Sequence, residues 1–148
     1  MRRAVITGMG IVSCLGNDKE SVTHSLKNGI SGIRRRDDFA EMGLRCNVGG
    51  LIDLDPKDHI DRKVLRFMGD SAAFGYIATD RAIADAGLSE ELVTSLRTGL
   101  IMGSGGLSGE MFVEAVDVMR ARGIKRAGPY RVTQIMASTV SACIATPF

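Results

Sequence analysis

The sequence has no tryptophan, and only two histidines and three cysteines among its 148 residues. Cys14, Cys46 and Cys143 are odd in number, lie far apart and form no C-x-x-C pair, which argues against a disulfide framework and against a zinc site. His24 and His59 form no H-x-x-x-H pair, so a metal site built on imidazole ligands is not expected. Three unpaired thiols suit a reducing compartment, and we expect a cytoplasmic protein.

Excess charge and long hydrophobic runs are also lacking. The formal net charge is +2, so composition does not favour nucleic acid as a partner. No stretch approaches the roughly 18 consecutive apolar residues of a membrane-spanning helix, and we expect no membrane segment. The start, MRRAVITGMGIVSC, resembles a lipoprotein signal, but its apolar stretch is short and is interrupted by Thr7, Gly8 and Gly10. A buried first strand is the better interpretation.

What remains is the composition of an ordinary globular protein, with 45% hydrophobic and 24% charged residues. A chain of this length fits one domain, residues 1–148. There is no internal repeat. Short apolar runs alternate with stretches of helical periodicity, and this alternation predicts an α/β protein with at least partly parallel strands.

The apolar pattern and its flanking residues place the elements. Asn17 and Asp61 are the expected helix caps, and Gly29 and Gly87 the expected helix stops. The chain between 29 and 60 is expected to be irregular. Strands are expected at 2–8 and 98–106, and helices at 18–28, 61–87 and 108–123, with a loop and a helix of small residues within 128–148.

Two glycine-rich stretches resemble phosphate-binding loops. VITGMGIVS follows the first predicted strand, as a dinucleotide-binding turn does, but no acidic residue closes a second strand at the expected distance. A tight turn between packed elements is the competing interpretation. GSGGLSG, residues 103–109, lacks the Lys and Ser/Thr of a P-loop. Its glycines suit close approach of an apolar ligand or another backbone, or a plain strand-to-helix turn.

The sharpest electrostatic feature is DRKVLRF, which places Arg62, Lys63 and Arg66 in the first turns of the long helix. Like charges at i,i+4 repel, and positive charge at a helix N-terminus opposes the helix dipole. Asp70 offsets part of this cost. Docking of an acidic partner therefore competes with a solvated helix face as the interpretation. Two cations at or beyond the end of the next helix extend such a patch: Arg122 and Lys125.

Cys143 stands among small residues, as a nucleophile often does. Nucleophilic catalysis requires a base that is itself oriented, and no sequence context pairs His24 or His59 with a cysteine. Cys143 also lies inside its expected helix instead of at the N-terminus, where the helix dipole would lower its pKa. An inert residue of the core is the better interpretation.

Five stretches carry a resemblance to a known family. They are RRAVITGMGIVSCLGN, IDRKVLRFMGDSAAF, RAIADAGLS, GLIMGSGG and GPYRVTQIMASTVSACIATPF. Together they resemble the N-terminal part of β-ketoacyl-acyl-carrier-protein synthases, and the similarity covers essentially the whole chain. The segments DRKVLRFMGD and MASTVSACIATPF are most similar to the type I elongating synthases of bacterial fatty acid synthesis.

The resemblance implies a thiolase-like layered fold, of which this chain covers most of the first half, and a homodimer in the full-length family. It also implies decarboxylative Claisen condensation, in which a cysteine takes the acyl chain and two histidines drive malonyl decarboxylation and attack. Substrates ride on the phosphopantetheine of acyl carrier protein, and no other cofactor is expected. The family's nucleophile lies in a second Ser-Ala-Cys beyond the equivalent of Phe148, so no catalytic residue is expected within 1–148 and this chain alone is expected to be inactive.

The same resemblance assigns supporting roles. Gly106 matches a position that lines the acyl tunnel, and Met136 one near its far end and the dimer interface. Two other classes stay open, a non-catalytic carrier-protein-binding partner of the chain-length-factor type and the nucleotide-binding module considered above. The positions that match carrier-protein docking residues are Arg45, Arg62, Lys63, Arg66, Arg122 and Lys125.

Overall fold

The computed structural model describes residues 3–148. Residues 3–12 form no regular element, and a tight turn closed by Ser13 and Gly16 then leads into helix α1 (Lys19–Lys27). The helix is capped by Asp18, whose carboxylate accepts a hydrogen bond from the Ser21 amide at 2.7 Å. Asn17, the predicted cap, instead donates through Nδ2 to the carbonyl of Asp53 at 2.9 Å. Gly29 follows the helix with a φ of +64°, as expected of a helix stop.

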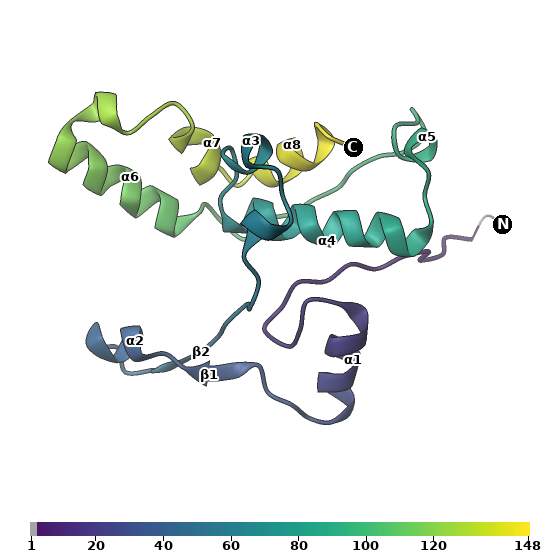
Figure 1. Ribbon diagram of the computed structural model, residues 1–148, viewed down its shortest axis with the longest axis horizontal. Helices are drawn as coiled ribbons and strands as arrows, with labels where there is room; N and C mark the ends of the chain where they lie inside the picture. Colours follow the sequence, from purple (N-terminus) through teal and green to yellow (C-terminus); the bar gives the residue numbers. More distant parts are fainter. Residues whose placement is uncertain (1–2) are drawn as a thin grey trace.

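A small antiparallel hairpin occupies the stretch that was expected to be irregular. Strands β1 (Ile33–Arg35) and β2 (Val48–Gly50) pair with each other, and the short helix α2 (Asp37–Glu41) lies between them. The 3₁₀ turn η1 (Pro56–Asp58) follows. Figure 1 shows the hairpin and α2 set apart from the main helices.

The helix expected at 61–87 is two helices, α3 (Arg62–Leu65) and α4 (Asp70–Ala86). The predicted cap is confirmed, because Asp61 accepts from the Lys63 amide at 2.7 Å, and so is the stop at Gly87, which has a φ of +63°. The helix is interrupted between α3 and α4, in a segment that contains Gly69. A Cβ atom on Gly69 would lie only 2.6 Å from the carbonyl oxygen of Gln134. A side chain there would prevent this approach of the C-terminal segment.

Helices form the rest of the chain. The expected helix at 108–123 is confirmed as α6 (Gly109–Arg122), with Glu110 in its first turn and Arg120 and Arg122 in its last, in agreement with the helix dipole. The C-terminal segment forms two short helices where one was expected. The remaining elements are α5 (Glu90–Val93), α6 (Gly109–Arg122), η2 (Ile124–Arg126), α7 (Arg131–Ile135) and α8 (Thr139–Ala145).

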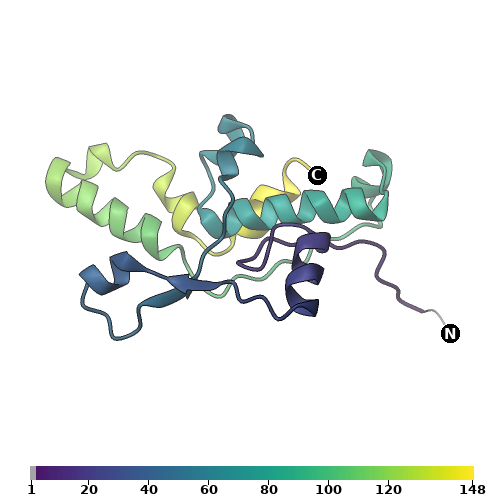
Figure 2. The same cartoon turned by 60° about the horizontal axis from the view of Figure 1, so that its bottom comes forward.

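The two predicted strands, and with them the parallel sheet, are wrong for the part of the chain described. Residues 3–8 and 98–106 form no strand, and Val5, Ile6 and Ile101 are 78%, 85% and 97% exposed. A strand is stabilised by a neighbouring strand, and the described chain places no strand beside either segment. Residues 3–12 run along α4 instead (Figures 1 and 2).

The core lies between α4 and α8. Val140 and Ile144 of α8 pack with Ala72, Ala73 and Ile77 of α4, and all five are buried. The accessible surface is 10951 Å², whereas a compact monomer of 15.8 kDa has roughly 7,300 Å². The chain therefore has a closed core on one side and much uncovered apolar surface elsewhere.

Candidate functional site

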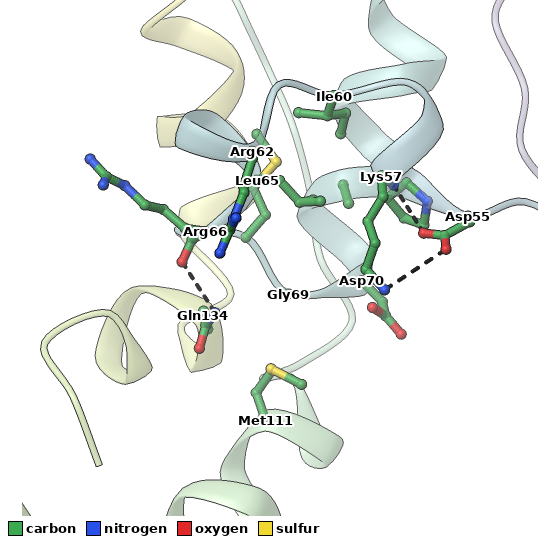
Figure 3. Close-up of a pocket in the computed structure, with 13 residues that line it drawn as sticks. Asp55, Lys57, Ile60, Arg62, Leu65, Arg66, Gly69, Asp70, Met111 and Gln134 are labelled. Carbon is green, nitrogen blue, oxygen red and sulfur yellow. Dashed lines mark hydrogen bonds and ion pairs between the residues drawn. The ribbon is translucent and has the colours of Figure 1, made fainter. Parts of the chain in front are cut away.

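An open cavity of about 840 Å³ lies beside α3 (Figure 3). Its apolar wall includes Leu65 of α3, Met68 of the segment between α3 and α4, and Met111 of α6. Charged groups stand around it. Lys57 forms an ion pair with Asp55 at 3.8 Å, so the charge of this lysine is already partly compensated. The charged residues of the lining are Asp55, Lys57, Arg62, Arg66 and Asp70.

The structure brings the three cations of DRKVLRF together on one turn at this cavity. Arg62 and Arg66 line it, and Lys63 is exposed on the same turn. The Asp61 cap and the hydrogen bond from the Arg66 amide to the Arg62 carbonyl, 3.2 Å, keep that turn helical. The predicted conflict between Arg66 and the helix dipole is wrong. Arg66 caps the C-terminal end of α3, where positive charge suits the dipole, and α4 begins separately at Asp70.

The other three predicted docking residues lie away from the cavity. Arg45 is exposed in the loop between α2 and β2, Arg122 ends α6, and Lys125 is exposed in η2. None of them lines the cavity. In Figure 1 the loop of Arg45 and the end of α6 lie on the same side of the molecule, beyond α3. The six cations thus form a central cluster with outlying members.

All six predicted docking residues carry charges that are uncompensated within the described chain. None of them forms an ion pair with a carboxylate of residues 3–148. Arg97 is likewise exposed and unpaired beyond α5, so the lack of an ion pair does not by itself distinguish the six predicted residues. The cations that do form ion pairs are Lys19, Arg34, Arg35, Arg36, Lys57 and Arg131.

Gly106 and Met136 lie on one small cavity between α4 and the C-terminal segment. Its volume of about 10 Å³ is at the lower limit for a single water molecule. A Cβ atom on Gly106 would meet nothing within 4 Å, and Met136 is 50% exposed. The structure thus places both residues side by side, and their tunnel role stays a prediction.

Cys143 lies inside α8, as predicted, and packs at the edge of the core. Burial raises the pKa of its thiol, which disfavours the thiolate that a nucleophile requires. Both histidines are exposed, and His24 contacts Asn28 at 3.3 Å, a neighbour on its own helix. Over residues 3–148 no group of His, Cys, Asp and Glu is arranged to hold a metal ion.

The glycines of VITGMG serve packing against α4. A Cβ atom on Gly10 would lie 1.8 Å from the carbonyl oxygen of Ala78, and one on Gly8 would lie 2.4 Å from that of Ala82. The Met9 amide between them donates to Asp85 at 3.0 Å. The face that a pyrophosphate would need is therefore occupied by a helix, which argues against the nucleotide-binding interpretation. The glycines of 103–109 meet nothing within 4 Å, so they serve no close approach in the described chain.

Three residues at the site were missed from the sequence. Phe67 and Tyr130 contact Arg66, and Gln134 donates through Nε2 to the Arg66 carbonyl at 3.1 Å. Tyr130 and Gln134 come from α7 and the residue before it, more than 60 positions along the chain from Arg66. No local pattern signals such a contact, although an aromatic ring directly after an arginine is a weak hint for Phe67.

The fold of the described residues agrees with one family. The family model for the N-terminal domain of β-ketoacyl synthases matches residues 1–148, and the chain belongs to that family. It is 54% identical over 149 residues to 3-oxoacyl-[acyl-carrier-protein] synthase 1 of Haemophilus influenzae, covering 100% of this chain and 37% of the relative. The chain thus spans little more than a third of the curated relatives it matches.

Solved structures show the same fold. A β-ketoacyl synthase from Burkholderia phymatum superimposes with a TM-score of 0.82 at 28% identity, over 98% of this chain and 36% of the other. The ishigamide ketosynthase/chain length factor gives 0.83 at 26% identity, over 95% and 36%. The predicted thiolase-like fold, present as its first part, is confirmed. No helix in the described part of the chain is long and apolar enough to cross a membrane.

Proposed function

We propose that this chain provides the N-terminal domain of a 3-oxoacyl-acyl-carrier-protein synthase of fatty acid biosynthesis, and that its part in the reaction is to dock acyl carrier protein. The observation that carries the proposal is the uncompensated cluster of Arg62, Lys63 and Arg66 beside a cavity, in a chain 54% identical to such a synthase. The phosphopantetheine of the carrier protein brings the substrates, and no other cofactor is invoked. A homodimer in the reducing cytoplasm completes the proposal.

The reaction joins an acyl thioester to a malonyl thioester. The acyl group passes from the carrier thiol to an enzyme cysteine, malonyl loses carbon dioxide, and the resulting carbanion attacks the acyl carbonyl and releases the cysteine thiolate. A partly buried cysteine with a raised pKa and no adjacent base does not suit the first step. We therefore assign Cys143 a structural role and leave the nucleophile to other parts of the synthase.

Docking of an acidic protein suits the cations in physical terms. Exposed charges of one sign steer an oppositely charged partner and set its orientation, and their effect weakens as salt increases. The cavity beside them gives the partner a concave surface with apolar walls. The outlying Arg45, Arg122 and Lys125 would contact the same partner at its periphery.

The test is the affinity of this chain for fluorescently labelled acyl carrier protein, followed by anisotropy. Arg62→Glu replaces an attraction by a repulsion and is expected to raise Kd about tenfold. Arg97→Glu makes the same charge change after α5, at the other end of α4 from α3, and is expected to alter Kd less than about twofold. Equal effects of the two variants, or an affinity independent of salt, would reject this docking surface.

A second candidate is a non-catalytic partner of the chain-length-factor type, favoured by the similarity to the ishigamide ketosynthase/chain length factor. Both candidates bind carrier protein, so binding does not separate them. Acyl loading does. A protein that contains this chain and the remaining length of the relatives gains the mass of one acyl group from acyl carrier protein if it is a synthase, and gains none if it is such a partner.

A further inference from the structure

The Arg66 side chain lies against two aromatic rings at the edge of the cavity. Its Cζ atom is 4.9 Å from the ring centroid of Phe67 and 5.1 Å from that of Tyr130. The two rings meet edge to face, with centroids 4.9 Å apart and planes at 82°. A guanidinium within about 6 Å of an aromatic ring is attracted to its π system. Since no carboxylate of the described residues pairs with Arg66, the rings hold the side chain without neutralising its charge.

The backbone under this contact is fixed by α7. Gln134 donates through Nε2 to the Arg66 carbonyl at 3.1 Å, and its Oε1 accepts from Arg131 at 3.3 Å. Arg131 also forms a two-point ion pair with Glu114 of α6, at 2.8 and 2.5 Å. A continuous set of polar contacts therefore joins α6, α7 and the segment between α3 and α4.

Tyr130 is held equally firmly. Its carbonyl accepts from the Gln134 amide at 3.0 Å and from the Thr133 hydroxyl at 2.7 Å, which fixes the start of α7. The close approach of the Gln134 carbonyl to Gly69 sets α7 directly on the break before α4. Figure 3 shows the Arg66 carbonyl oxygen facing Gln134 and the Arg66 side chain extending away from the cavity. The arginine thus has a rigid support and a free charged end.

We propose that Phe67 and Tyr130 are positioning residues, which hold the Arg66 guanidinium ready for an acidic partner protein. The inference rests on the proposed function, because it takes acyl carrier protein as that partner. An arginine side chain loses considerable rotamer entropy when a partner immobilises it. A guanidinium that is already held by two rings loses less on binding, so part of the affinity comes from this preorganisation.

The test compares Kd for labelled acyl carrier protein among variants of the 148-residue chain. Tyr130→Leu removes the ring and keeps an apolar side chain, and is expected to weaken binding about fivefold. Tyr130→Phe keeps the ring, and its Kd is expected to stay within about twofold of that of the unmodified chain. In the Arg66→Ala background Tyr130→Leu is expected to have no further effect, because the residue to be positioned is gone. A merely structural role of Tyr130 would weaken binding in both backgrounds.

The outcomes separate the two proposals. Suppose that the unmodified chain binds carrier protein, that Arg66→Ala weakens this binding and that Tyr130→Leu does not. This result would overturn the positioning role of Tyr130 and would leave the docking surface standing. Absence of carrier binding by the unmodified chain overturns the proposed function and this inference with it. If Tyr130→Leu fails to fold, judged by circular dichroism, Phe67→Leu decides by the same comparison in the two backgrounds.

Discussion

The contact of the N-terminal segment with α4 makes Gly10 the most sensitive position for a small substitution. Gly10→Ala adds one methyl group, and its Cβ atom would lie 1.8 Å from the Ala78 carbonyl oxygen and 2.8 Å from the Ala82 amide nitrogen. These are backbone atoms of a seventeen-residue helix, which cannot move aside as a flexible side chain can. The N-terminal segment must therefore shift away from α4.

Forcing extra volume into a packed contact lowers the free energy of unfolding by about 1–3 kcal/mol. Detachment of the segment limits the loss, because it sacrifices the Met9–Asp85 hydrogen bond and the packing of Gly8 but leaves the α4–α8 core intact. We expect Gly10→Ala to lower the free energy of unfolding by about 2 kcal/mol. For a urea m-value of about 2 kcal/mol/M, the midpoint moves down by about 1 M.

Gly105→Ala is the matched control, because a Cβ atom there meets nothing within 4 Å and the residue has no positive φ. Alanine restricts the unfolded chain, so this variant is expected to be neutral or stabilised by up to about 1 kcal/mol. The assay is urea unfolding of both variants followed by far-ultraviolet circular dichroism. Equal midpoints for the two variants would refute the packing of the glycine segment on α4.

Three further predictions concern charge, thiols and association. Lys19 holds the pKa of the Asp85 carboxyl below its ordinary value, with help from the Met9 amide, so the stabilisation is present above about pH 4 and is lost as the pH falls through the folded pKa. Asp85→Asn should lower the urea midpoint at neutral pH and match the parent chain in acid; a constant difference would contradict this. The raised pKa and partial burial of Cys143 predict that iodoacetamide alkylates it about tenfold more slowly than exposed Cys46, as measured by peptide mass spectrometry. Cys143→Ser should leave the activity of a full-length synthase substantially intact. The roughly 3,600 Å² of surface beyond that of a compact monomer predicts self-association in sedimentation, and a monodisperse monomer with a cooperative melt would contradict it.

Local signals in the sequence predicted local features of the fold. The helical region begins after Asp61, whose side chain caps it, and ends at Gly87, which adopts the left-handed conformation of a helix stop. Helix α6 has the charges that suit its dipole. Asn17 was displaced as a cap by the neighbouring Asp18, because a carboxylate one position later can reach the Ser21 amide. Errors of one residue at a helix end are expected when two capping side chains are adjacent.

Features that depend on distant partners were not predicted. The apolar runs at 2–8 and 98–106 have strand composition, yet a strand forms only beside another, and the described chain does not bring one to either. The break at Gly69 depends on the approach of the Gln134 carbonyl, and the support of Arg66 depends on Tyr130. Arg62 and Arg66 were singled out from the sequence because like charges at i,i+4 stand out without any knowledge of the fold.

The docking surface is tested most directly by zero-length cross-linking of lysine amines to the carboxylates of acyl carrier protein, followed by mass spectrometry. The chain has five lysines, at positions 19, 27, 57, 63 and 125. We predict that Lys63 on α3 and Lys125 in η2 form the cross-links, and that both are suppressed at high salt. Cross-links confined to Lys19 and Lys27 on α1, with Lys63 and Lys125 unmodified, would contradict the assignment of this surface to the carrier protein.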